Sequence, residues 1–127
     1  GALPRYVGPT GQCQETGRDQ GHAQLGLEAL EHICEMAYLV SQHATLCEKW
    51  GDIAKTDLWG ALDNRLLKGI EYTARYNLGY DVPFETWQDC TGLYCEWTKP
   101  GEMGRGRLWD RPARLAWRMY KKVFHIL

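Results

Sequence analysis

DQGHAQLGLEALEHICEMAYLV, residues 19–40, is the stretch that decides the fold class. Its apolar residues recur three and four positions apart, which places them on one face of a helix. Asp19 stands just before the pattern and has a side chain typical of helix N-caps. The sequence therefore predicts a helix from about Asp19 to Val40 with an apolar stripe of Ala23, Gly26, Leu27, Leu30, Ile33, Cys34 and Ala37.

Two further helices are predicted along the chain. One is expected from about Asp57 to Leu78, ended by Gly79, with a buried side of Trp59, Leu62, Leu66, Ile70 and Thr73. The other begins at Pro112, with an apolar side of Ala116, Met119, Tyr120 and Val123. Residues 1–17, 81–84 and 88–110 are predicted to be loops. Because no segment alternates in the manner of a strand, the fold class is all-α with long structured loops.

The composition fits one globular domain over residues 1–127, since 44% of the residues are apolar. No stretch approaches the ~18 apolar residues of a membrane span. Six Trp and seven Tyr suit a surface that stacks on sugars, or a core and its rim. The chain opens without an initiator methionine, which is typical of a processed, truncated or cleaved product.

The charge is divided along the chain. Residues 1–98 hold seven Lys/Arg and fourteen Asp/Glu, whereas residues 99–127 hold eight Lys/Arg and two Asp/Glu. Such a basic tail attracts a polyanion or docks on an acidic part of a larger protein. The positive charge is concentrated only in this tail, and no nucleic-acid-binding motif occurs, so a nucleic-acid partner is not expected.

The five cysteines indicate a disulfide-containing, secreted protein, with a reduced cytosolic protein as the alternative. Cys90 and Cys95 bracket a short turn and are predicted to bridge locally, and Cys34 and Cys47 to pair near a helix end. Cys13 is then left over. No Cys-x-x-Cys pair occurs, and the four histidines lack ligand spacing, so no metal cofactor is expected, with calcium left open.

The densest polar cluster, residues 12–24, lies where a loop meets the first predicted helix. Arg18 and His22 are four positions apart and share a face if the helix begins by Arg18. A guanidinium can hold a carboxylate, and a neighbouring imidazole can take a proton. A structural interpretation is a capping network in which Asp19 and the glutamines satisfy helix-end amides and Arg18 pairs with Glu15.

A second polar group lies on the second predicted helix. Arg65, Lys68, Tyr72 and Tyr76 form one stripe apart from the apolar side. Cations meet carboxylates while aromatic faces stack on sugar rings, so this stripe suits an anionic sugar chain. The alternative is a solvated helix face with two half-buried tyrosines.

Two stretches carry a family resemblance. QETGRDQGHAQLGL, residues 14–27, and DNRLLKGIEYTARYNLG, residues 63–79, followed by DVPF at 81–84, resemble alginate-lyase-like proteins of fungi and bacteria, which are related to glucuronan and alginate lyases. The resemblance spans roughly residues 10–87 and fades after Trp87. It implies that the chain is the carboxy-terminal portion of a larger (α/α) toroid of helical hairpins around a groove.

The resemblance also implies an activity, the cleavage of 1,4-linked uronic-acid polymers by β-elimination. Arg18 would neutralise the substrate carboxylate and His22 would serve as base or acid, although better-known alginate lyases place a tyrosine there. Contacts with the anionic polysaccharide would come from Gln14, Gln20, Arg65, Lys68, Tyr72 and Tyr76.

The resemblance leaves part of the site unaccounted for. Family members are longer, and their amino-terminal Asn/His motif has no counterpart in this sequence. A second polypeptide carrying the amino-terminal part of the fold would then complete the enzyme. The alternatives are a fragment, a non-catalytic module that binds anionic carbohydrate, and a helical protein-interaction domain.

Overall fold

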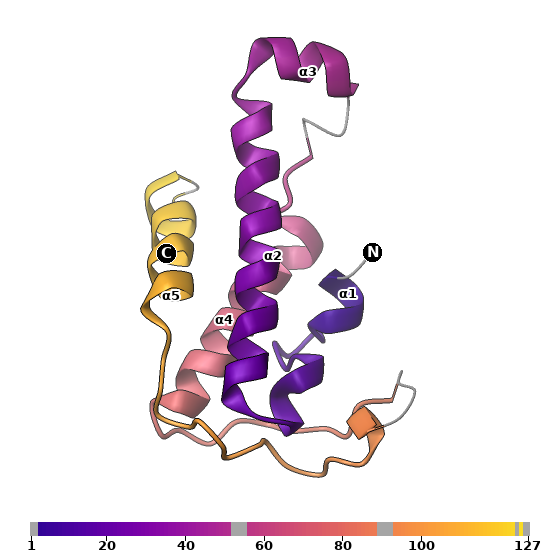
Figure 1. The fold of residues 1–127 in the computed structure, drawn as a ribbon, viewed down its shortest axis with the longest axis vertical. Coiled ribbons are helices and arrows are strands. Elements are labelled where there is room, and N and C mark those ends of the chain that lie inside the picture. Colours follow the sequence, from indigo (N-terminus) through magenta and orange to yellow (C-terminus); the bar gives the residue numbers. More distant parts are fainter. Residues whose placement is uncertain (1–2, 52–55, 89–92, 124, 126–127) are drawn as a thin grey trace.

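The computed structural model describes residues 3–51, 56–88, 93–123 and 125. Within these ranges the regular structure is helical, which confirms the predicted all-α class, and a single bridge joins Val7 to Cys13. Figure 1 shows a long helix, α2, with the other helices grouped around it. The elements are α1 (Leu3–Tyr6), η1 (Gln14–Gly17), α2 (Gln20–Ser41), α3 (Ala44–Trp50), α4 (Ala61–Asn77), η3 (Leu93–Cys95), α5 (Asp110–Ala116) and the π-helix η4 (Trp117–Val123).

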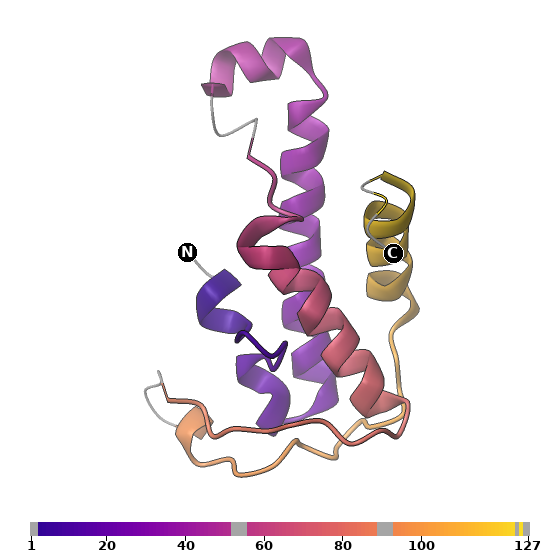
Figure 2. The same ribbon diagram turned by 180° about the vertical axis from the view of Figure 1, so that it is seen from behind.

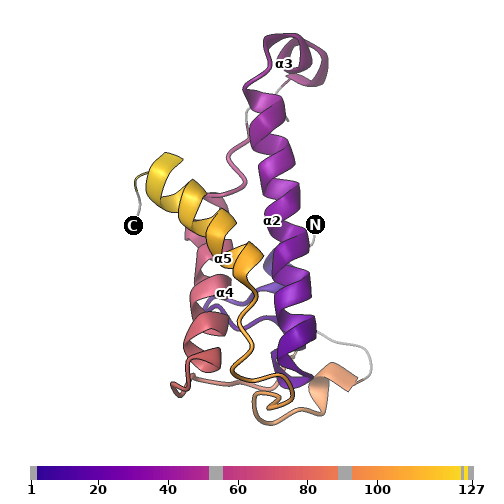
Figure 3. The ribbon, with the colours of Figure 1, turned by 60° about the vertical axis from the view of Figure 1, so that its left-hand side comes forward.

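The core forms where α2 meets α4 on one side and the α5–η4 helix on another (Figures 1 and 3). Ala23, Leu27, Leu30 and Cys34 of the predicted stripe are buried, but Ile33 is 57% exposed at the edge of the packed side, beside Leu58 and Leu62. The buried partners are Leu66 and Leu67 of α4 and Ala116, Met119 and Tyr120 of the last helix.

The basic tail docks on an acidic face of its own chain. The acidic residues of α2 are Glu28, Glu31 and Glu35, spaced three and four residues apart. Arg111 lies 3.5 Å from the Glu28 carboxylate, and Arg118 contacts that of Glu35. Part of the positive charge of residues 99–127 is therefore paired with acidic residues of the same chain.

Buried side-chain amides fasten the long irregular segments to the helices. Gln24 on α2 accepts the backbone NH of Trp109 at 2.7 Å and donates to the carbonyl of Arg107 at 2.9 Å. The Gln12 side chain likewise accepts the backbone NH of Glu85 and donates to the Glu85 carbonyl. These bonds hold the segments after α4 beneath the ends of the helices (Figure 2).

Several boundaries differ from the prediction. Residues 1–17 contain the short helices α1 and η1 rather than an extended loop, and α3 was not predicted. Helix α4 begins at Ala61 rather than Asp57, and its first turn is left-handed, since the φ angles of Leu62, Asp63 and Asn64 are 54°, 58° and 53°. Leu62 is accordingly 48% exposed rather than buried. The predicted start of the last helix near Pro112 is confirmed to within two residues, while the side chain of Val123 lies outside the described part.

The cysteines follow the prediction only in part. Cys95 is disulfide-bonded, and its predicted partner Cys90 lies outside the described residues. Cys34 and Cys47 are both free, so the predicted bond between them is wrong. The two thiols donate to different backbone carbonyls, Cys34 to Leu58 and Cys47 to Val40 and Ser41. None of the described helices is long and apolar enough to cross a membrane.

Candidate functional site

Asp19 organises the first turn of α2. It is the N-cap residue, and its Oδ1 accepts the backbone NH of His22 at 2.8 Å. Its Oδ2 lies 2.7 Å from Nδ1 of the His22 ring. One carboxylate therefore caps the helix and fixes the orientation of the imidazole.

Arg18 reaches the same carboxylate from outside the helix. Because α2 begins at Gln20, Arg18 and His22 do not share a helical face as predicted, and Asp19 connects them instead. Arg18 Nε lies 3.7 Å from Asp19 Oδ2, and Nη1 lies 3.6 Å from Oε2 of Glu15. The capping and pairing network is thus present, and it brings the two candidate catalytic side chains to one acidic group.

The electrostatics keep this acidic group ionised. Burial by itself would raise the pKa of Asp19, but hydrogen bonds from the backbone and ring of His22 and the positive charges of His22 and Arg18 lower it. The Asp19 side chain is 7% exposed, whereas those of His22 and Arg18 are 42% and 47% exposed. A shielded carboxylate thus supports an accessible imidazole and an accessible guanidinium.

The imidazole is arranged to exchange a proton with a bound molecule. In the neutral imidazole whose hydrogen on Nδ1 is donated to Asp19, the Nε2 atom of His22 carries the lone pair that accepts a proton. The nearby guanidinium is a donor for a carboxylate. An acid–base group beside an anion-binding group is the minimum needed to remove a proton next to a carboxylate.

An aromatic pair stands beside this group and was not predicted as part of a site. The hydroxyl of Tyr94 donates to Glu15 at 3.1 Å, and its ring meets Trp97 edge to face with centroids 5.4 Å apart. Gly17 lies against Trp97 so closely that a Cβ would stand 2.5 Å from the Trp97 Cβ. A hollow lined by Gly17 and residues 96–102 opens there. Only the high Trp and Tyr content of the sequence pointed to these rings.

The two candidate glutamines are placed differently. Gln20 is 1% exposed and uses both ends of its amide inside the protein, donating to Gly101 and accepting from Asn77. Gln14 is half-buried in η1. In this structure Gln20 is therefore a structural residue that ties α2 to α4 and to the loop at Gly101.

The second candidate cluster is not an open stripe. Tyr72 and Tyr76 are 4% and 6% exposed, and their hydroxyls donate to the carbonyls of Pro83 and Pro100. Burial raises the pKa of Tyr72 beyond its ordinary range, so this phenol stays protonated. The expectation that both rings stand apart from the packed side of the helix is corrected, because long loops cover them.

The two cations of that cluster keep some access. Arg65 donates to the Val7 carbonyl at 3.1 Å, and Lys68 lies 2.6 Å from Asp63. Lys68 also lines a hollow with the unpredicted cation Arg75, together with Thr10, Glu71, Tyr72, Val82 and Pro83. The candidate residues therefore fall into separate groups, one at the start of α2 and one along α4.

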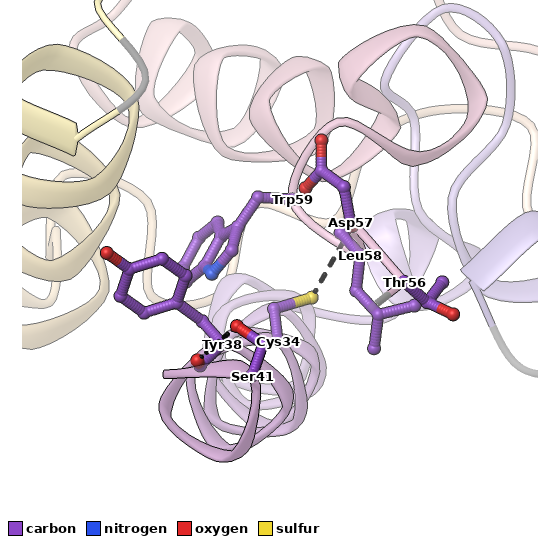
Figure 4. Close-up of a pocket in the computed structure, with 7 residues that line it drawn as sticks. All are labelled: Cys34, Tyr38, Ser41, Thr56, Asp57, Leu58 and Trp59. Carbon is purple, nitrogen blue, oxygen red and sulfur yellow. Dashed lines mark hydrogen bonds between the residues drawn. The ribbon is translucent and has the colours of Figure 1, made fainter. Parts of the chain in front are cut away.

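A different pocket lies between the carboxyl-terminal half of α2 and the segment before α4 (Figure 4). The described residues that line it are Cys34, Tyr38, Ser41, Thr56, Asp57, Leu58 and Trp59. They include no Lys, Arg or His, so this described lining is poorly suited to a carboxylate. Burial and the nearby carboxylates of Glu31 and Asp57 raise the pKa of Cys34 to about 11, which makes its thiol a poor nucleophile.

Among the described residues no group of three or more His, Cys, Asp or Glu side chains is placed to hold a metal ion. Comparison with protein-family models, with curated proteins and with solved structures finds no match to this chain. The case for a function therefore rests on the residues themselves.

Proposed function

We propose that this chain carries the proton-transfer site of a polysaccharide lyase that cleaves 1,4-linked uronic-acid polymers, of the alginate or glucuronan type, by β-elimination. One observation carries the proposal. His22 Nδ1 is held 2.7 Å from the shielded Asp19 carboxylate while Arg18 reaches the same carboxylate from the accessible side.

The chemistry assigns one task to each side chain. Arg18 binds the C6 carboxylate of a uronate and stabilises the negative charge that develops when C5 loses its proton. His22 Nε2 removes that proton, and the C4–C5 double bond forms as the bond from C4 to the glycosidic oxygen breaks. The imidazolium then returns a proton to the departing oxygen. Asp19 stabilises the imidazolium and keeps Nδ1 protonated throughout.

The surroundings support a sugar ligand. Tyr94 and Trp97 stand beside Glu15, the acid that pairs with Arg18, and such aromatic faces stack on pyranose rings. A second polypeptide, or a further part of the protein, would supply the opposite wall of the groove and a further group on the carboxylate. The site is expected to work in an extracellular protein, in keeping with the disulfide-bonded Cys95.

The test is the ultraviolet absorbance of the unsaturated uronate product, measured with polymannuronate, polyguluronate and glucuronan. Arg18→Ala and His22→Ala are each expected to lower the rate by about 100-fold or more. Arg114→Ala and His125→Ala are the controls, because both side chains are exposed and belong to the carboxyl-terminal region. Full activity in both site variants would refute the assignment.

A non-catalytic module that binds anionic carbohydrate is the alternative outcome of the same experiment. It predicts binding of uronate oligosaccharides, lost in Arg18→Ala, with no unsaturated product from any of the three polymers. Binding of a protein partner without any affinity for carbohydrate would instead favour an interaction domain.

A further inference from the structure

The outer side of α2 is an exposed apolar face. Leu25, Ile33 and Met36 are 55%, 57% and 65% exposed. Helix α4 packs behind α2 in the view of Figure 1 and in front of it in the view of Figure 2. At helical spacing Leu25 and Met36 fall opposite the buried Leu27 and Cys34, while Ile33 lies at the edge of the packed side, beside the start of α4. Large apolar side chains that recur along a helix and face water are typical of an interaction surface.

This outer face also carries no formal charge. Between Leu25 and Val40 the acidic residues of α2 all lie toward α5 or in the core, and the helix contains no Lys or Arg. A partner for such a face has to be equally uncharged, since a charge buried opposite it would remain unpaired. We call this surface the outer stripe: Leu25, Ala29, His32, Ile33, Met36, Leu39 and Val40.

A groove widens the apolar surface at the middle of the outer stripe. Ile33 lines it together with apolar side chains of α1, of the segment before α4 and of the first turn of α4, including Leu3, Leu58 and Leu62. It has a volume of about 300 Å³. The exposed surface therefore has a concave part that can receive side chains from a partner.

We propose that the outer stripe binds the outer stripe of a second copy of this chain, with the two α2 helices antiparallel. We place the two-fold axis between His32 and Ile33. Each residue before the axis then lies opposite the residue of the other copy that follows the axis by the same number of positions. Leu25 then lies opposite Val40, and the small Ala29 lies opposite the long Met36. The stripe is therefore complementary to itself in charge and in size.

The spacing of the stripe suits a long contact. Ala29, Ile33, Met36 and Val40 are separated by four, three and four residues, the alternation that keeps two helices in contact along their length. A single crossing point would bury only one or two of these residues. The pairing instead covers most of the exposed apolar side chains of α2.

The same pairing has a consequence for the candidate site, and this consequence rests on the proposed function. His22 lies at the start of α2, and the exposed His43 lies just beyond its end. In the antiparallel pair, His43 of one copy comes opposite His22 of the other. The second copy would thus add an imidazole to the wall of each site.

The mass of the protein in solution tests the pairing, by light scattering and sedimentation at micromolar concentrations. We expect a species of twice 14.6 kDa for the wild type. Met36→Glu should weaken the association by at least about 100-fold, because it places an unpaired carboxylate in an apolar contact. Leu78→Glu is the control, since Leu78 is 66% exposed but follows α4, and it should leave the mass unchanged.

A second variant tests the size complementarity without adding charge. Ala29→Trp should also yield the monomer, since the added ring occupies the space meant for Met36, while circular dichroism shows that the helices remain. A monomeric wild type overturns the proposal, and so does a dimer that persists in both Met36→Glu and Ala29→Trp. His43→Ala should keep the dimer mass and lower lyase activity. Unchanged activity would refute only the contribution of His43 to the site, and the dimer itself would stand.

Discussion

At the scale of the single residue, Asp19 serves two structural partners at once. Its two oxygens bind the backbone amide and the ring of His22. Asparagine is as good an N-cap as aspartate, but it lacks the negative charge that stabilises an imidazolium. The two roles are therefore separable by one substitution.

We predict that Asp19→Asn leaves the thermal unfolding temperature nearly unchanged and lowers the rate of product formation by about 100-fold. The loss should fall on kcat rather than KM, because Asp19 acts through His22 and does not touch the substrate. Melting curves and steady-state kinetics on the same preparation separate the two readouts. A loss of stability would show that the charge of Asp19 also stabilises the fold, and an unchanged rate would show that Asp19 does not act through His22.

Glu31 differs from Asp19, because it is a buried acid without a hydrogen-bond partner among the described residues. It is 0% exposed, and neither of its carboxylate oxygens has a hydrogen-bond partner in the part of the chain that the structure describes. Burial, with the neighbouring charges of Glu28 and Glu35, raises its pKa from 4.5 to about 9. Glu31 is therefore protonated in the folded protein at neutral pH and ionised in the unfolded chain.

This difference predicts how stability depends on pH. Between pH 4.5 and about 9 the folded state holds a proton that the unfolded state has lost, so the free energy of unfolding falls as pH rises. Glu31→Gln should be more stable than the wild type at pH 8 and should remove most of this slope. Urea unfolding at pH 5, 7 and 9 checks it, and an unchanged slope in the variant would contradict the assignment.

At the scale of the element, the start of α4 is strained. Leu62, Asp63 and Asn64 all have left-handed backbone angles, which cost a residue such as leucine about 1–2 kcal/mol and aspartate or asparagine less. The side-chain oxygen of Asn64 is also buried without a hydrogen-bond partner within the described ranges of the chain. The regular right-handed helix begins only after this turn.

We predict that Asn64→Gly raises the free energy of unfolding by about 1 kcal/mol, because glycine adopts the left-handed angles without strain. Ala74→Gly, in the right-handed part of α4, should lower it by about 1 kcal/mol. Chemical denaturation of the two variants measures both changes. Destabilisation of similar size in both would show that the left-handed turn carries no strain.

The elements that the sequence predicts well are those with long apolar stripes. Helix α2 runs for 22 residues and buries most of its predicted stripe, so its type and limits follow from periodicity alone. Helices α1 and α3, with four and seven residues, are too short for a period to be read. Ile33 fits the helical spacing but is exposed at the edge of the stripe, because spacing does not say how much of a stripe the neighbouring helices cover.

The site was predictable only where its residues are close in sequence. Arg18 and His22 stand out as a pair, and Asp19 between them completes the group. Gln20 has the same polar character, yet its bonds go to Gly101 and Asn77, far along the chain. Such long-range partners cannot be inferred from local spacing, so nothing in the sequence indicates that the Gln20 amide makes hydrogen bonds inside the protein.

At the scale of the whole molecule, the last helix is held by charge as well as by packing. Met119 and Tyr120 are buried, while Arg111 and Arg118 face the acids of α2. Exposed ion pairs contribute up to about 1 kcal/mol, so burial supplies most of the docking energy. The ion pairs fix which face of α2 the helix covers.

We predict that Arg118→Glu lowers the free energy of unfolding by about 1 kcal/mol, because it sets a carboxylate beside Glu35. Adding Glu35→Arg should restore most of the loss, since the pair then has the reverse polarity. A double-mutant cycle in urea, at low and high salt, measures the coupling. Additive losses in the double variant would exclude a direct pair.

The buried Gln and Asn side chains that anchor the irregular segments have a consequence for the rate of backbone amide hydrogen exchange. The backbone NH groups of Glu85, Gly106 and Trp109 donate to the side-chain oxygens of Gln12, Asn77 and Gln24. These peptide groups lie in irregular chain, but the side chains that accept their hydrogen bonds are buried, so the amide protons are released only when those side chains become exposed. In deuterated water these three protons should exchange nearly as slowly as those of α2, while those of their immediate neighbours exchange quickly.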